Sequence, residues 1–226
     1  MLEIRWEVYT NKSAGFTQYV SHLRDADLKT NTGRRRYVDI HPWSNLRLVS
    51  VVAAGLADFD GRPESLAVLT QALGAEQARS LRAGLLEAAI SQTSFVRKYR
   101  DDLSLHRDRH RRDGIKATAY FYVTVLPFRE REFEQLWLEV LAAYRKLAPG
   151  MTLTAAQTLS GGGPHYVFAR PLKDYAEFES HLAPEHAVEK AFGRARREAF
   201  DRQAAASVRK WETLVLDRSG FDVNVP

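Results

Sequence analysis

The strongest constraint on the fold is an order of strand-like and helix-like segments that occurs twice along the 226 residues. In the first half, residues 2–9 alternate apolar and polar side chains, which is typical of a strand with one buried face. After Ser13, a residue suited to a helix N-cap, four apolar residues follow at helical spacing: Phe16, Tyr19, Val20 and Leu23. The next expected elements are two strands, a helix and a strand, at residues 37–41, 46–53, 75–91 and 93–99.

The second half repeats this order from residue 118 onward. Strands are expected at residues 118–126, 151–159, 165–170 and 211–216. One helix is expected around the stripe of Phe133, Leu136, Trp137 and Val140, and a second, long one at 188–208. The order β-α-β-β-α-β is that of a ferredoxin-like unit. The sequence therefore predicts an α+β fold of two tandem ferredoxin-like repeats, at residues 1–104 and 117–226, joined by a charged linker at 105–116.

Short sequence matches favour a duplication of this unit. Ala72-Leu73-Gly74 and Ala191-Phe192-Gly193 are related by a constant offset (193 − 74 = 119). Near the start of each half, Phe16 and Phe133 are related by a similar offset (133 − 16 = 117). The identities are few, so the ordered match of element types carries most of the argument.

Composition excludes several kinds of site. The chain has no cysteine, which excludes disulfides, thiolate metal ligands and a cysteine nucleophile. The net charge of +5 allows a polyanionic partner, but the basic runs at 33–36 and 106–112 are typical of solvated loops. The aromatic-basic pattern of RNA-binding ferredoxin-like domains is missing, so no nucleic-acid partner is expected.

The chain also lacks a run approaching the roughly 20 apolar residues that span a bilayer, so no membrane span is expected. Its first residues form a strand-like segment, so no signal peptide is expected. A cytoplasmic protein and a mature secreted form both agree with this, and the localisation stays open.

The segment HYVFARPLKDYAEF, from His165 to Phe178, leads from a strand through an acidic, aromatic turn toward a helix. In this it resembles members of the dimeric α/β-barrel superfamily. The chain is also similar to uncharacterised bacterial tandem-repeat proteins of this type, whose repeats end in a segment like RKYRDDLS at 97–104. Asp101 stands where those proteins have proline, and residues 216–221 depart further. The resemblance implies antiparallel sheets packed face to face as an α/β barrel with a pocket inside, within one chain or across a homodimer.

Strand alternation predicts which side chains face such a pocket. Ile4, Trp6 and Val8 suit the helix-packed face, so their neighbours point the other way. We expect these side chains to line a site for a small organic ligand, because the set is aromatic with a few charges. The predicted lining residues are Arg5, Glu7, Tyr9, Arg47, Tyr122, Thr124, Tyr166, Phe168 and Arg170. His165, which follows the glycine-rich loop 160–164, is a further ligand-binding candidate. Alternatively, Arg5, Glu7, Arg47 and Arg170 form ion pairs between the sheets.

No catalytic residue follows from the sequence, which contains neither a GxGxxG nor a GxxxxGK[ST] motif. The leading hypothesis is small-molecule binding with oxygenase-like activity, and the alternative is a non-catalytic structural or interaction module. A second alternative is haem binding through His165, His181 or His186, because some barrels of this superfamily bind haem through histidine. His106 and His110 have a metal-ligand spacing but lie among arginines, so no metal is expected there.

Overall fold

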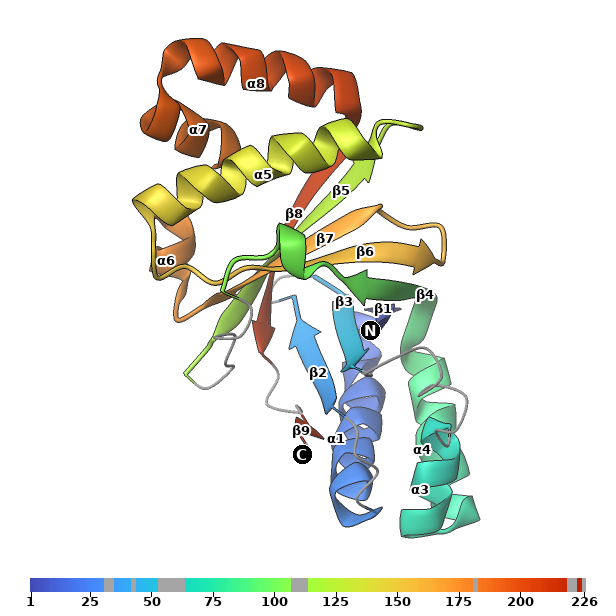
Figure 1. Ribbon diagram of the computed structural model, residues 1–226. Coiled ribbons are helices and arrows are strands. Elements are labelled where there is room, and N and C mark those ends of the chain that lie inside the picture. The colour runs from blue at the N-terminus through green and yellow to red at the C-terminus, as the bar shows by residue number, and fades with distance from the viewer. Residues whose placement is uncertain are drawn as a thin grey trace. The chain divides into compact units, whose positions relative to one another are not determined.

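The computed structural model describes residues 1–30, 35–41, 44–52, 64–106, 114–180, 183–218 and 223–224. These residues form a mixed α+β fold of antiparallel strands and helices (Figure 1). The chain divides into two compact units, one made of Met1–Val96 with Asp217–Pro226 and the other of Arg97–Leu216. Most of the expected linker, and His110 and His181, lie outside the described residues.

The first unit has the expected elements in the expected order, together with one additional helix before the helix expected at 75–91. It contains β1 (Leu2–Val8), the 3₁₀ turn η1 (Thr10–Lys12), α1 (Ser13–Thr30), β2 (Arg35–Ile40), β3 (Leu46–Val52), α3 (Ser65–Leu73), α4 (Ala75–Ala88) and most of β4 (Ala89–Tyr99). The antiparallel strand order is β2–β3–β1–β4. The end of β8 (Val208–Arg218) and β9 (Val223–Asn224) add to β2.

The predicted alternation of β1 is confirmed. Val8 is fully buried, and Ile4 and Trp6 pack on the same cluster, which also holds Phe16 and Val20 of α1. The apolar stripe that follows Ser13 therefore covers one face of this sheet.

The second unit repeats the order with its own core. It contains η2 (Asp101–Leu103), β5 (Ala117–Val125), α5 (Glu130–Leu147), β6 (Thr154–Ser160), β7 (Tyr166–Leu172), α6 (Tyr175–Glu179), α7 (Pro184–Phe192), α8 (Arg194–Ser207) and most of β8. The strand order is β6–β7–β5–β8. All four residues of the predicted α5 stripe are buried against the sheet.

The prediction of a single helix at 188–208 is wrong. Two helices, α7 and α8, meet at Gly193, whose φ of 92° and ψ of 168° break the helix. Only glycine adopts this backbone region without strain. In the first unit, α4 ends at Ala88 and β4 begins at Ala89, so the strand is longer than expected.

Corresponding helices of the two units have matching lengths. The pair α7 and α8 begins and ends 119 residues after α3 and α4 (184 − 65 = 119; 207 − 88 = 119). Helix α5 lies 117 residues after α1 (130 − 13 = 117), and each has 18 residues. Gly74 has a φ of 90°, close to that of Gly193, so the matched ALG and AFG tripeptides end equivalent helices.

Within the described ranges, no helix is both long and apolar enough to cross a membrane.

Candidate functional site

The second unit contains a cavity between its helices and its sheet, with a volume of about 760 Å³. It lies among α5, α7, α8, β5 and β8. Seventeen residues line it: Phe121, Phe133, Leu136, Trp137, Val140, Phe178, Glu179, Ala183, Pro184, Glu185, Arg197, Phe200, Asp201, Ala204, Val208, Trp211 and Thr213. We call this space the aromatic cavity.

Six aromatic rings make up much of the wall of the aromatic cavity. Trp137 of α5 and Trp211 of β8 have ring centroids 6.0 Å apart, and Phe121 of β5 lies 6.2 Å from Trp211. Phe200 of α8 is buried, whereas Trp211 is 38% exposed. The wall is therefore apolar inside and open to solvent near β8, which suits a flat organic molecule.

Polar groups of the wall gather on α7 and α8. The Arg197 guanidinium donates to Asp201 at 2.7 Å and to Glu189 at 3.2 Å. The hydrogen bond to Asp201 raises the pKa of Arg197, which stays charged. Because Arg197 is already paired, its charge is balanced before any ligand arrives.

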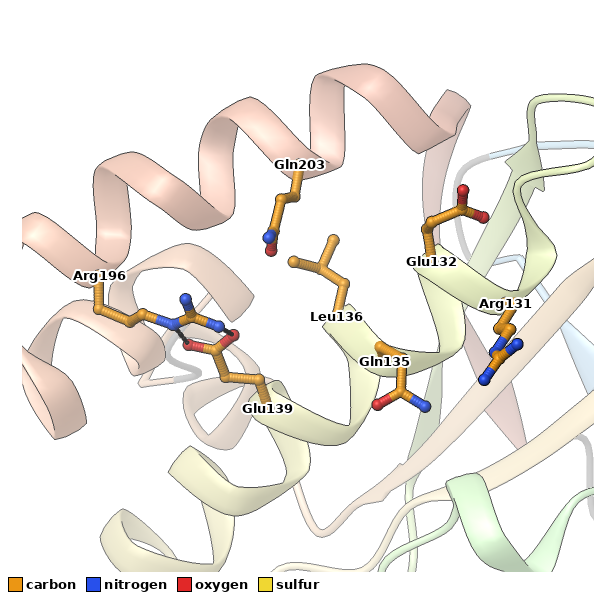
Figure 2. Close-up of a pocket in the computed structure, with 7 residues that line it drawn as sticks. All are labelled: Arg131, Glu132, Gln135, Leu136, Glu139, Arg196 and Gln203. Atoms are coloured by element: carbon orange, nitrogen blue, oxygen red, sulfur yellow. Dashed lines mark hydrogen bonds and ion pairs between the residues drawn. The ribbon is translucent and has the colours of Figure 1, made fainter.

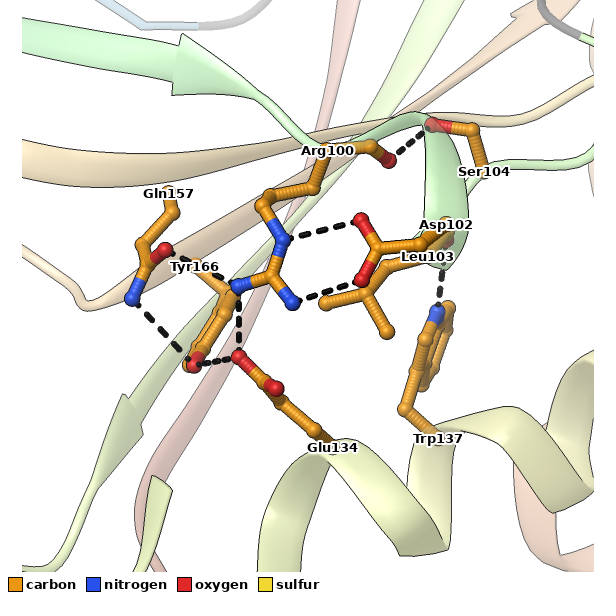
Figure 3. A network of polar contacts seen from close by, with 8 residues as sticks. All are labelled: Arg100, Asp102, Leu103, Ser104, Glu134, Trp137, Gln157 and Tyr166. Atoms are coloured by element: carbon orange, nitrogen blue, oxygen red, sulfur yellow. Dashed lines mark hydrogen bonds and ion pairs between the residues drawn. The ribbon is translucent and has the colours of Figure 1, made fainter. Parts of the chain in front are cut away.

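Trp137 is held in place by the 3₁₀ turn η2. Its Nε1 donates a 3.1 Å hydrogen bond to the carbonyl oxygen of Leu103, as Figure 3 shows. On its other side the indole stacks on Phe168 of β7, with centroids 3.8 Å apart. This cavity wall is therefore fixed in position by both a polar and an aromatic contact.

A polar network supports the same region (Figure 3). Arg100 binds Asp102 through two hydrogen bonds of 2.9 and 2.7 Å, and it donates to Glu134 at 2.6 Å and to Gln157 at 2.9 Å. The Tyr166 hydroxyl donates to the same Glu134 oxygen at 2.7 Å. The network thus ties η2, α5, β6 and β7 together next to Trp137.

The network also changes the acidities of its members. Hydrogen bonding to Arg100 lowers the pKa of Glu134 below its usual range, although burial opposes the shift. Burial, and then the hydrogen bond to Glu134, raise the pKa of the Tyr166 phenol. At neutral pH, Glu134 is therefore an acceptor and Tyr166 a donor.

In the corresponding region of the first unit, the two helices approach each other closely. There, α1 and α4 touch at Gly15 and Gly84. The offsets of 117 and 119 place Glu132 and Gln203 at these positions of α5 and α8, and both line open space in the second unit. Similarly, the fully buried Ala78 corresponds to Arg197 of the cavity wall.

The face expected for Tyr166 and Phe168 is wrong. Both are fully buried against α5, where Tyr166 lies 4.9 Å from Phe133. Tyr122 does face away from these helices, because it is opposite Val167 in the antiparallel register, and Thr124 follows on the same side. Every residue of β7 but Ala169 is buried, so burial does not reveal its faces.

Arg170 and Arg47 also lie on helix-packed faces. Arg170 shares the face of Phe168 and forms a 3.2 Å ion pair with Glu177 of α6. Arg47 is opposite Trp6 in the register and donates to the carbonyl oxygens of Ser44 and Leu46. Burial lowers the pKa of Arg47. Both arginines therefore lie on the faces opposite to those that we expected, and that prediction is wrong.

The other candidates are scattered. Arg5 and Glu7 lie on the β1 face that points away from the helices, where Glu7 accepts from Ser91 at 3.2 Å. Tyr9 follows β1 and is 48% exposed. His165 accepts the backbone N–H of Val125 through Nδ1 at 2.9 Å. A ligand role for these residues stays a prediction.

Among the described residues, the wall of the aromatic cavity contains no histidine that could ligate a haem iron, and His186 on α7 is exposed. Among the described residues, no group of three or more His, Asp or Glu side chains is arranged to hold a metal ion. The wall residues that the sequence reading missed as site residues, such as Phe200 and Trp211, look like ordinary core residues. The one available signal is that the positions of Gly15 and Gly84 in the first unit are matched by Glu132 and Gln203 in the second unit.

No protein-family model matches the sequence, and no curated protein matches it significantly. Solved structures do match over most of the chain. An anthrone oxidase-like protein has a TM-score of 0.62 at 12% identity, with 96% of this chain and 90% of that chain covered.

Two other matches have similar coverage. A proposed monooxygenase from Lactobacillus acidophilus NCFM has a TM-score of 0.55 at 9% identity, over 95% of this chain and 91% of that chain. Chlorite dismutase from Candidatus Nitrospira defluvii has a TM-score of 0.54 at 9% identity, over 97% of this chain and 90% of that chain. At these identities the likeness concerns the fold alone, and the chain has the ferredoxin-like α+β fold of these proteins.

Proposed function

We propose that the protein binds a flat, largely apolar organic molecule in the aromatic cavity of its second unit. The observation that carries this proposal is a space of about 760 Å³ walled by six aromatic side chains. Sites that enclose small organic ligands have volumes of about 300–1,000 Å³ and are lined mainly by apolar and aromatic residues. Ring–ring contacts favour an aromatic ligand over a flexible aliphatic one.

The proposal places the ligand beneath the helices, away from the predicted inter-sheet face. The tandem duplication is part of the same proposal, and the matching lengths and constant offsets of the helices support it. In one copy the Gly15–Gly84 contact closes the helices, and in the other the helices leave room for a ligand. Binding of one ligand per chain follows from this difference.

A titration with 1-naphthol tests the binding proposal. Isothermal titration calorimetry of the unaltered protein is expected to give one site per chain. The variant Ala204→Trp fills the cavity from α8 and is expected to weaken binding at least about tenfold. Its matched control is Ala205→Trp, at an exposed position of the same helix, which should bind like the unaltered protein.

Two outcomes contradict the proposal. One is the absence of 1-naphthol binding to the unaltered protein, which would favour the structural or interaction module. The other is equal binding by Ala204→Trp and Ala205→Trp, which would place the ligand outside the aromatic cavity.

Oxygenase-like activity is the first reaction class to test. Neighbours described as a proposed monooxygenase and an anthrone oxidase-like protein support this choice. Oxidation of anthrone by one O₂ gives anthraquinone and one water, so an oxygen electrode follows the reaction directly. Protein-dependent O₂ uptake that Ala204→Trp abolishes and Ala205→Trp retains is the expected result. Uptake equal to that of anthrone alone would reject this activity.

A homodimer, which the superfamily resemblance implies, is a separate prediction. Light scattering of the purified protein tests it: a mass of one chain would contradict it.

A further inference from the structure

A second hollow lies between α5 and α8 and differs in chemistry from the aromatic cavity. Its volume is about 510 Å³, and it is lined by Arg131, Glu132, Gln135, Leu136, Glu139, Arg196 and Gln203. We call it the polar groove. In Figure 2, Leu136 points from α5 toward Gln203 of α8, and the Arg196–Glu139 pair lies to one side.

Two ion pairs involve the lining of the polar groove: Arg196 pairs with Glu139 across it, and Glu132 pairs at 2.8 Å with Arg129, which lies outside the lining. Arg196 donates to both oxygens of Glu139, at 2.5 and 2.6 Å, which spans the gap between the helices. The lining holds two arginines and two glutamates, so its formal charge is zero. The side-chain amides of Gln135 and Gln203 add uncharged hydrogen-bond donors and acceptors. This set suits a neutral hydroxylated group better than a phosphate or a carboxylate, which would need a net positive site.

Leu136 belongs to the walls of both spaces, and among the described residues it is the one that they share. It is 5% exposed, so its buried side chain marks where the two spaces adjoin. In the first unit, by contrast, the corresponding helices α1 and α4 approach closely at Gly15 and Gly84. A molecule that passes beside Leu136 would place its rings in the aromatic cavity and its polar end in the polar groove.

We propose that the polar groove is a second subsite of the same ligand, and that it takes an uncharged, hydroxyl-bearing group attached to the aromatic body. This inference rests on the proposed function and adds the class of molecule: a neutral aromatic amphiphile such as an aryl glycoside. The aromatic cavity supplies apolar contact, and the polar groove discriminates among head groups. Gln135 and Gln203 are the residues that determine this specificity.

The test compares three probes with the same rings: 1-naphthol, 1-naphthyl β-D-glucopyranoside and 1-naphthyl phosphate. Calorimetry of the unaltered protein is expected to show the glucoside binding about fivefold tighter than 1-naphthol, and the phosphate binding more weakly than both. In the double variant Gln135→Ala/Gln203→Ala, the advantage of the glucoside should disappear while the affinity for 1-naphthol stays the same. The control is Gln77→Ala, at an exposed glutamine of α4, which should keep the advantage.

The outcomes separate the two proposals. Binding of 1-naphthol without any advantage for the glucoside overturns the subsite and leaves the proposed function standing. Tighter binding of the phosphate than of the glucoside also overturns it, because it indicates an anion site. If none of the three probes binds, both proposals fail. An advantage that survives in the double variant places the head group outside the polar groove.

Discussion

A Cβ atom on Gly15 of α1 would lie 2.4 Å from the carbonyl oxygen of Gly84 on α4. Real Cβ atoms do not come this close to a carbonyl oxygen, so the two helices depend on glycine at position 15. The packing does not require glycine at position 84, because a Cβ on Gly84 would meet only the Gly15 Cα, at an ordinary contact distance of 3.9 Å. Two substitutions that add the same methyl group therefore have opposite expected effects.

Gly15→Ala is expected to lower the free energy of unfolding by about 1–3 kcal/mol, because the helices must move apart. Gly84→Ala should raise it by up to about 1 kcal/mol, because alanine is the better helix former and the space is sufficient. Urea unfolding followed by circular dichroism measures both. Equal effects of the two variants would show that α1 and α4 do not pack in this way.

The break between α7 and α8 gives a second prediction. Gly193 has a φ of 92°, so Gly193→Ala should cost about 1–3 kcal/mol of unfolding free energy even though nothing lies within 4 Å of the added Cβ. Gly150→Ala is the control, because its Cβ also meets nothing within 4 Å and its φ is not in the left-handed region. Thermal unfolding at equal scan rates compares them. A continuous helix through residue 193 is indicated if Gly193→Ala is neutral or stabilising.

The buried ion pair of the first unit gives a third prediction. Asp27 of α1 is 0% exposed and Arg36 of β2 is 2% exposed, and their charged atoms are 2.5 Å apart. Asp27→Asn removes one charge and leaves the other buried, which should cost about 3–5 kcal/mol. In Asp27→Leu/Arg36→Met both charges are gone, so the cost should be smaller than that of Asp27→Asn. Chemical unfolding measures both costs, and a larger cost for the double variant would contradict this explanation.

The Arg100–Glu134 contact predicts a dependence of stability on pH. The folded-state pKa of Glu134 lies below its ordinary value of 4.5, so its carboxylate stabilises the fold above about pH 4.5 and loses this effect as the pH falls further. Glu134→Gln should therefore cost about 1–3 kcal/mol at about pH 7 and much less at about pH 3. Urea unfolding at both pH values gives the comparison.

Tyr166→Phe is the control for that experiment, because it removes the hydroxyl but leaves the Arg100–Glu134 pair. Its cost should also fall between about pH 7 and about pH 3, but by less than that of Glu134→Gln, because the hydrogen bond from Tyr166 lowers the pKa of Glu134 less than the one from Arg100 does. A cost of Glu134→Gln that does not change with pH would mean that Glu134 is not held ionised by Arg100.

The order of elements could be predicted from the sequence because each element has a clear local pattern. The stripes around Phe16 and Phe133, and the alternation in residues 2–9, depend only on helical and strand periodicity. The break at Gly193 was also visible in principle, since Ala191-Phe192-Gly193 matches Ala72-Leu73-Gly74 at the end of an equivalent helix.

The faces of the second sheet and the cavity could not be predicted in the same way. Strand β5 is buried at every position except Thr124, so apolar residues point to both sides and alternation does not assign Tyr122 and Phe168 to opposite faces. A cavity depends on how far apart two helices lie. That distance follows from tertiary packing, such as the presence of Gly15 and Gly84 in one unit and of Glu132 and Gln203 in the other.

The most direct test of the central claim is a crystal structure of the protein soaked with 1-bromonaphthalene, with anomalous scattering used to locate bromine. We predict one bromine site per chain, in the aromatic cavity beside Phe200 and Trp211, and none between α1 and α4. An empty aromatic cavity at saturating ligand, or a bromine site only outside it, would contradict the account.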